Sequence, residues 1–144
     1  MTKPGPHVRF PMKTAAASAA LAAALTTAAV LAAPASAASY NDVCGSGYGV
    51  VNSADLPGGA GTVFLTYNAA NGRNCAVNVR ADAGERLPMD VQLARSDDPD
   101  SAALDTGDFT EYAGPVYLEA RGQCVTWSGI TGTGQAGKAG TNCG

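Results

Sequence analysis

Hydrophobic and polar residues alternate in short segments along much of the chain. In the clearest of these segments, Met89, Val91 and Leu93 alternate with Asp90 and Gln92. A period of two places successive side chains on opposite faces of an extended strand, so each such segment predicts a β-strand with one buried face. The predicted strands are residues 48–51, 62–67, 74–80, 89–95, 116–120 and 123–127.

Glycine-rich turns separate these strands. Asn71-Gly72 lies between the second and third strands, and glycine adopts positive φ at little cost, so this pair predicts a β-hairpin. Arg121-Gly122 predicts a second hairpin between the last two strands. No segment has the spacing of an amphipathic helix. Short strands joined by such turns predict an all-β fold, a small antiparallel sandwich or barrel.

Two segments lack this alternation. Residues 97–108 are rich in aspartate and predict a solvated acidic loop, whereas residues 129–144 are rich in glycine and threonine and predict an irregular tail held by Cys143. Neither segment is expected to form a strand.

The first 37 residues have the parts of a secretory signal peptide. Three basic residues precede an alanine-rich apolar stretch, and Ala35 and Ala37 are the small residues that a signal peptidase recognises. A membrane anchor is the alternative, but alanine contributes little to insertion and Pro34 ends the run. We therefore predict a signal peptide at residues 1–37 and one secreted domain at residues 38–144, with no membrane span in the mature chain.

Removal of the signal peptide makes the protein strongly acidic. All twelve acidic residues but only six of the nine basic ones follow residue 37, so six bases against twelve acids give the mature chain a net charge of −6. An acidic surface repels phosphate groups, which argues against binding of nucleic acid or anionic lipid.

Four cysteines follow the signal peptide. An even number in a small exported domain predicts two disulfides, and their wide spacing together with the absence of histidine after residue 37 argues against zinc. Three pairings are possible. We favour Cys44 with Cys75 and Cys124 with Cys143, because each bond would tie one end of the domain to a nearby strand. The expected fold is thus stapled by two disulfides.

The mature chain lacks the residues of common hydrolase mechanisms. Without histidine it has no Ser-His or Cys-His pair, and disulfide-bonded cysteines are not nucleophiles. Asp105-Thr106-Gly107 matches the D-T-G of aspartic proteases, but that chemistry needs two carboxylates, so an ordinary turn is the favoured interpretation. We predict no catalytic residues, no bound cofactor and no enzymatic activity.

Two further hypotheses concern ligands. Dense carboxylates could bind Ca²⁺, although their spacing fits no EF-hand and a solvated loop is favoured. These carboxylates belong to Asp97, Asp98, Asp100, Asp105 and Asp108. Aromatic rings can stack on sugars, and Tyr112, Tyr117 and Trp127 are the candidate ligand platform, although packing in the core is their favoured role.

Six segments of the sequence resemble those of a known protein family. They are residues 44–48 (CGSGY), 61–68 (GTVFLTYN), 74–75 (NC), 112–117 (YAGPVY), 124–129 (CVTWSG) and 142–144 (NCG). In their order and spacing they resemble the spore-associated protein A family of filamentous actinomycetes. The resemblance implies a small secreted protein on spores or aerial hyphae, with spore or cell-wall components as partners, and it transfers no catalytic residue or ligand.

Three functions therefore follow from the sequence, in order of preference. The first is a secreted, spore- or hyphal-surface-associated protein without a catalytic site. The second is a carbohydrate- or cell-wall-binding module that uses exposed aromatics. The third is a small secreted hydrolase or protease inhibitor.

Overall fold

The computed structural model describes residues 37–144, so the predicted signal peptide at residues 1–37 lies, except for Ala37, outside the described residues. The described chain forms eight β-strands and one 3₁₀ turn. These elements are β1 (Gly49–Asp55), η1 (Pro57–Gly59), β2 (Gly61–Asn68), β3 (Arg73–Arg80), β4 (Leu87–Arg95), β5 (Asp98–Phe109), β6 (Tyr112–Glu119), β7 (Val125–Thr131) and β8 (Gly134–Thr141).

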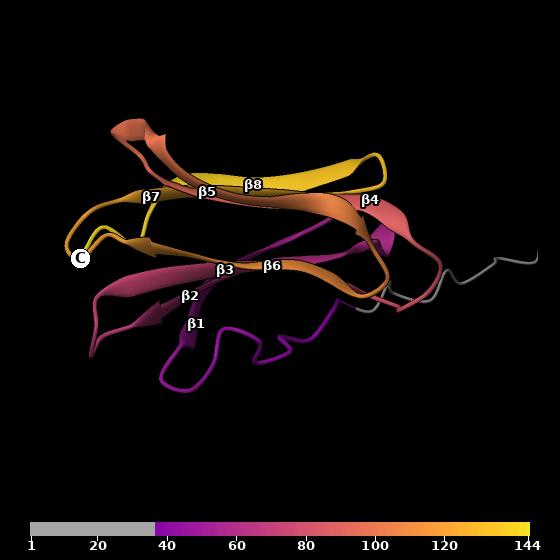
Figure 1. Ribbon diagram of the computed structural model, residues 1–144, viewed down its shortest axis with the longest axis horizontal. Helices are drawn as coiled ribbons and strands as arrows, with labels where there is room; N and C mark the ends of the chain where they lie inside the picture. The colour runs from indigo at the N-terminus through magenta and orange to yellow at the C-terminus, as the bar shows by residue number, and fades with distance from the viewer. Residues whose placement is uncertain (1–36) are drawn as a thin grey trace, which may run out of the picture. The chain divides into compact units, whose positions relative to one another are not determined.

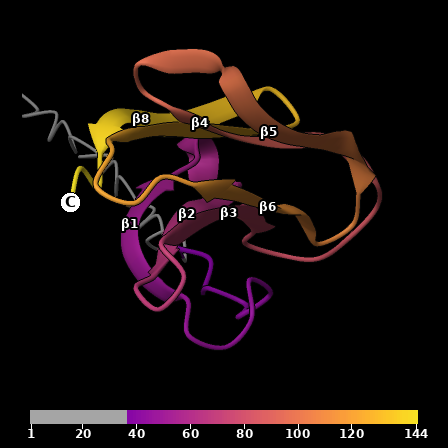
Figure 2. The same cartoon turned by 60° about the vertical axis from the view of Figure 1, so that its left-hand side comes forward.

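The strands form two four-stranded antiparallel sheets. Sheet 1 has the order β1-β2-β3-β6, and sheet 2 has the order β5-β4-β7-β8. Figures 1 and 2 show them as two facing layers. The predicted all-β fold is confirmed, and its architecture is an antiparallel sandwich.

Side chains from both sheets fill the space between the layers. The predicted inward set of Met89, Val91 and Leu93 is confirmed, since these side chains are 2%, 0% and 0% exposed. The cluster between the sheets comprises Leu56, Val63, Leu65, Ala76, Met89, Val91, Leu93, Ala113, Val116, Leu118, Ala120, Val125 and Trp127.

The outer face of sheet 1 is covered by residues 38–48, which we call the covering segment. The Tyr40 ring packs against Phe64 with centroids 5.7 Å apart, and the Tyr117 hydroxyl donates a hydrogen bond to the backbone oxygen of Cys44 at 3.0 Å. Figure 1 shows this indigo segment on the side of sheet 1 that faces away from sheet 2. The two central strands of sheet 1, β2 and β3, are consequently buried on both faces, whereas no residue of β1 is buried.

Both predicted disulfides are confirmed. Cys44–Cys75 joins the covering segment to β3, and Cys124–Cys143 joins the turn after β6 to the residues after β8. The bonded residues are 31 and 19 positions apart, and loops of this length contribute about 3–4 kcal/mol each on a chain-entropy model.

One predicted hairpin is confirmed and the other is wrong. β2 and β3 pair up to Asn68 and Arg73, and Gly72 in their turn has a φ of 73°. The turn at Arg121-Gly122, in contrast, leads from sheet 1 to sheet 2, because β6 pairs with β3 while β7 pairs with β4 and β8. A tight turn reverses the chain without deciding which strands hydrogen-bond to one another.

The predicted acidic loop and irregular tail are also wrong. The acidic residues lie mainly on β5, which pairs with β4, and most of the tail is β8, which pairs with β7. Aspartate and glycine are poor strand formers, so these strands leave little trace in local sequence. Both are edge strands of sheet 2, where pairing with one neighbour overrides that preference.

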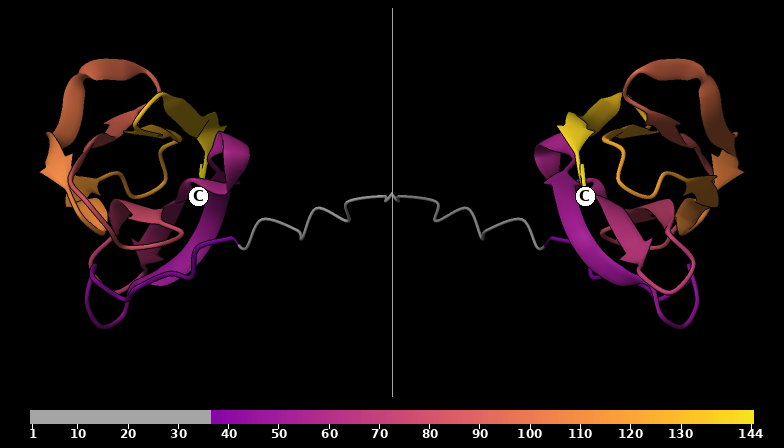
Figure 3. Two further views of the ribbon diagram at one scale, coloured as in Figure 1. Left: turned by 90° about the vertical axis from the view of Figure 1, so that its right-hand side faces the viewer. Right: turned by 90° about the vertical axis from the view of Figure 1, so that its left-hand side faces the viewer.

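Hydrogen bonds join the two sheets along both sides of the sandwich. On one side Lys138 Nζ of β8 donates to Asn52 Oδ1 of β1 at 2.7 Å, and Figure 3 shows β8 in yellow beside β1 in indigo. On the other side the backbone N–H of Gly114 in β6 donates to Asp105 Oδ2 in β5 at 2.7 Å.

Candidate functional site

The outer face of sheet 2 presents polar side chains to solvent. Residues paired directly across antiparallel strands project from the same face of a sheet. The register therefore aligns two rows across β5, β4, β7 and β8, which we call the polar face. The first row is Leu104, Gln92, Ser128 and Gly137, and the second is Thr106, Asp90, Ile130 and Gln135.

Exposure distinguishes this face from the outer face of sheet 1. Gln92, Thr106 and Gln135 are exposed, and Leu104 is 58% exposed. On sheet 1 the corresponding outward side chains of β3, such as Val77, are buried beneath the covering segment. Sheet 2 therefore presents outward side chains to solvent, whereas the central strands of sheet 1 do not.

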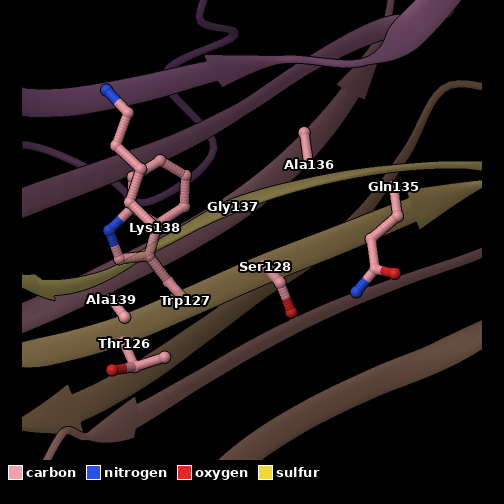
Figure 4. A pocket seen from close by; sticks show the side chains of 8 residues that line it. All are labelled: Thr126, Trp127, Ser128, Gln135, Ala136, Gly137, Lys138 and Ala139. Carbon is pink, nitrogen blue, oxygen red and sulfur yellow. The ribbon is translucent and has the colours of Figure 1, made fainter.

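A shallow hollow lies on the polar face where β7 meets β8 (Figure 4). Thr126, Ser128 and Gln135 point to one side of these strands, whereas Trp127 and Lys138 point to the side of sheet 1. The Thr126 hydroxyl also lies 2.9 Å from the Ser96 hydroxyl at the end of β4. Alternation along β7 thus places hydroxyl groups outward and the indole inward.

Gly137 is the residue that lets β8 approach β7 at this point. A Cβ atom at Gly137 would lie 2.3 Å from the backbone oxygen of Trp127 and 2.7 Å from the Cα of Ser128. Such a contact is far inside van der Waals separation, so any larger residue would push the strands apart. The floor of the hollow is therefore backbone, and its polar groups come from the neighbouring side chains.

Asp90 is the charged member of the two rows. Its Oδ1 accepts a hydrogen bond from the backbone N–H of Ile130 at 2.9 Å. Burial raises the pKa of the Asp90 carboxyl, and the hydrogen bond from Ile130 opposes that shift in part. The remaining polar side chains of the rows are neutral, so the face offers hydrogen bonds rather than strong electrostatic attraction.

The aspartates considered for Ca²⁺ are distributed along one strand. Asp98 pairs with Arg95, and Asp105 accepts the Gly114 N–H. Within residues 37–144 no three histidine, cysteine or acidic side chains are grouped closely enough to hold a metal ion.

Asp105-Thr106-Gly107 lies inside β5, so the predicted turn at this motif is wrong. The Asp105 side chain is half-buried and its carboxylate binds the backbone of β6. This places Asp105 in a structural link between the two sheets.

The three aromatic residues of the candidate platform do not form one surface. Tyr112 and Tyr117 are half-buried beside the covering segment, and Tyr117 packs edge-on against Tyr48 with centroids 5.6 Å apart. Trp127 is 1% exposed between the sheets, and its Nε1 donates to Thr141 Oγ1 at 2.9 Å. A stacking platform must expose a ring face, so Trp127 cannot belong to one in this fold.

Sequence reasoning did not identify the polar face. The predicted strand at residues 123–127 contains Thr126 but ends before Ser128, and the predicted outward side chains Asp90 and Gln92 belong to the face. The residues of the face on β5 and β8 could not be found, since local sequence predicts a loop for the first strand and an irregular tail for the second. The signal that was available is the run of small polar residues between inward positions of β7.

These features define a class: a small antiparallel β-sandwich with two disulfides, one sheet whose two central strands are buried on both faces, and one sheet with an exposed polar face. The chain is 51% identical over 107 residues to Spore-associated protein A of Streptomyces coelicolor. The matched region covers 74% of this chain and 68% of that protein. The chain therefore belongs to the spore-associated protein A family. No protein-family model matches the sequence, and no solved structure matches it.

Proposed function

We propose that residues 38–144 form an exported, non-catalytic protein that attaches to the outer surface of spores or hyphae. The observation that carries this proposal is the identity of 51% to Spore-associated protein A. The basic and alanine-rich leader with Ala35 and Ala37 supports export. Two disulfides are consistent with an oxidising compartment outside the cytoplasm.

Attachment is proposed to occur through the polar face. Its hydroxyl and amide groups suit surface components of the spore or wall that carry uncharged hydrogen-bonding groups, because these offer complementary donors and acceptors. The net charge of −6 disfavours ionic adsorption to an anionic wall. In the part of the chain that is described, no helix is long and apolar enough to cross a membrane.

A carbohydrate-binding module is the second candidate function. It now depends on the hydrogen-bonding face rather than on exposed aromatics, because Trp127 is buried. Binding of purified protein to insoluble neutral polysaccharide, measured by sedimentation, would distinguish glycan binding from binding to a spore protein.

Extraction of intact spores tests attachment. We expect the protein to leave the spore surface in mild detergent at both low and high salt, without cell breakage. Resistance to both conditions, with release only by a wall-degrading enzyme, would mean covalent attachment and contradict the proposal. Recovery from the cytosol alone would contradict export.

A matched pair of glutamine variants tests which face is used. Gln92→Arg places a long charged side chain in the middle of the polar face, whereas Gln123→Arg makes the same change at an exposed turn outside it. We expect the first variant to lose spore binding and the second to retain it. Equal binding by both variants would remove the polar face from the proposal while leaving surface association intact.

A further inference from the structure

The two disulfides differ in their access to solvent. Cys44 and Cys75 are 4% and 0% exposed beneath the covering segment. Cys143 is exposed and Cys124 is half-buried. Exchange requires an attacking thiolate to reach one of the bonded sulfur atoms, so solvent access favours reaction at Cys124–Cys143.

The accessible disulfide holds the end of an edge strand. β8 pairs with β7 on one side only, none of its residues is buried, and residues 137–140 are all exposed. The C-terminus lies at the same end of the sandwich as the turn between β6 and β7 (Figure 1), where Cys124 anchors it. Few apolar contacts hold residues 138–144, so the covalent bond is a major restraint on this segment.

Side-chain hydrogen bonds connect the same segment to the core. Trp127 Nε1 donates to Thr141 Oγ1 at 2.9 Å, and Asn142 Nδ2 donates to Asn74 Oδ1 at 2.6 Å. Trp127 also pairs across the strands with Lys138. The end of β8 therefore covers the polar edge of the indole, two residues before Cys143.

We propose that Cys124–Cys143 is a thiol-exchange site, and that its opening frees the end of β8 and exposes Trp127. The Cys44–Cys75 bond stays closed under the same conditions and preserves sheet 1 with its covering segment. This inference rests on burial and connectivity, and it is independent of attachment through the polar face.

The reactant is a small thiol from the surroundings, and the exchange is balanced. Its thiolate forms a bond to the sulfur of Cys143 and breaks the Cys124–Cys143 bond, and the electron pair remains on the Cys124 sulfur, which takes a proton from water. A second thiol then attacks the mixed disulfide, giving the oxidised small thiol and a free Cys143. Two electrons pass from two small thiols to one protein disulfide.

A time course with 2-mercaptoethanol tests both parts of the proposal. Oxidised protein comprising residues 38–144 is sampled during the reaction, free thiols are alkylated, and peptide mapping reports each disulfide separately. We expect Cys124–Cys143 to open at least about tenfold faster than Cys44–Cys75, because access controls the rate of attack. Simultaneous opening, or earlier opening of Cys44–Cys75, would overturn the assignment of the exchange site.

Fluorescence of Trp127 reports whether the end of β8 opens, because the chain contains a single tryptophan. In the same samples we expect a red shift of its emission and an increase of about twofold or more in its acrylamide quenching constant, as local opening admits the quencher. Removal of the thiol and reoxidation should restore both signals. Selective opening without a change at Trp127 would refute the link between the disulfide and the end of β8.

A variant carrying Cys124→Ser and Cys143→Ser gives the open state without reductant. We expect high quenching of Trp127 that does not respond to added thiol. Low quenching in a folded variant would contradict the proposal. If this variant fails to fold, the time course on the unaltered protein still tests both the selective opening of Cys124–Cys143 and the exposure of Trp127.

Discussion

Asn78 on β3 donates from Nδ2 to the backbone oxygen of Ile130 on β7 at 2.8 Å, which joins the two sheets through the core. The same nitrogen lies 2.9 Å from the backbone oxygen of Asp90 and 3.1 Å from Thr131 Oγ1, and Asn78 is 0% exposed. A Cβ at Gly129 would lie 2.9 Å from this amide nitrogen, so the glycine leaves room for it. A buried amide with such partners fixes how the sheets face each other, because a shift would leave its donors unpaired.

Replacement of Asn78 should therefore destabilise the fold strongly. Asn78→Asp places a carboxylate opposite two carbonyl oxygens and should lower the free energy of unfolding by about 3 kcal/mol or more, since a buried charge would lack a partner. Asn78→Ala should lower it by about 2–3 kcal/mol through lost hydrogen bonds. Urea unfolding measures both, with Asn71→Asp in the exposed β2–β3 turn as the control. Equal stability of the Asn78→Asp and Asn71→Asp proteins would show that the buried amide is dispensable.

Asp90 predicts a pH dependence of stability. Burial raises the folded-state pKa of its carboxyl above the ordinary value, so the folded protein binds the proton more tightly than the unfolded chain does. The contribution of this group to stability is therefore greatest at acidic pH and falls as pH rises through the folded-state pKa. Asp90→Asn removes the titration and retains an oxygen that can accept the Ile130 N–H.

We expect the free energy of unfolding of Asp90→Asn, minus that of the parent protein, to be more positive at pH 7 than at pH 4. Thermal unfolding at the two pH values measures this difference. Asp82→Asn, which removes one negative charge at an exposed position, is the control. If the variant instead gains more stability over the parent at pH 4 than at pH 7, the pKa of Asp90 is lowered in the folded protein. The hydrogen bond from Ile130 would then outweigh the effect of burial.

Asp105 should matter for stability and not for catalysis. Asp105→Ala leaves the Gly114 N–H without its acceptor and should cost about 1–2 kcal/mol, whereas Asp105→Asn keeps an oxygen there and should cost less. Chemical unfolding of both variants, compared with Asp108→Ala at an exposed position of the same strand, measures the effect. We expect no peptidase activity at acidic pH. Acid peptidase activity that disappears in Asp105→Asn would instead assign a catalytic role.

Export predicts a defined amino terminus. Ala35 and Ala37 precede the expected cut, so the secreted protein should begin at Ala38. The intact mass of protein from the culture supernatant measures this directly. Retention of residues 1–37 in that protein would refute the predicted signal peptide.

Local alternation was sufficient to predict strands throughout sheet 1 and in the centre of sheet 2, but not the edge strands of sheet 2. β4 carries the expected inward and outward residues, and the disulfide pairing was predicted because each bond would tie one end of the domain to a nearby strand. β5 and β8 could not be predicted because their residues gain strand structure only from a neighbouring strand. The turn at Arg121-Gly122 likewise depends on which sheet offers the next free edge, which is a property of the whole fold.

The candidate site was harder to predict than the fold. A flat polar face is built from single residues on four strands, and its rows exist only once the register is known. The aromatic hypothesis depended on exposure, which sequence cannot report. Trp127 lies in the core because its position on β7 points inward, and its indole N–H donates a hydrogen bond to Thr141 Oγ1.

The covering segment makes β2 and β3 intolerant of change in a way that the strands of sheet 2 are not. Six consecutive residues of β2 and six of β3 are buried, whereas buried and half-buried residues alternate along β7. Among relatives about as similar as the 51% identical protein, accepted substitutions should therefore be rare at both odd and even positions of β2 and β3. In β7 they should gather at every second residue, so that the family diverges mainly on the polar face, where side chains can change without rebuilding the core.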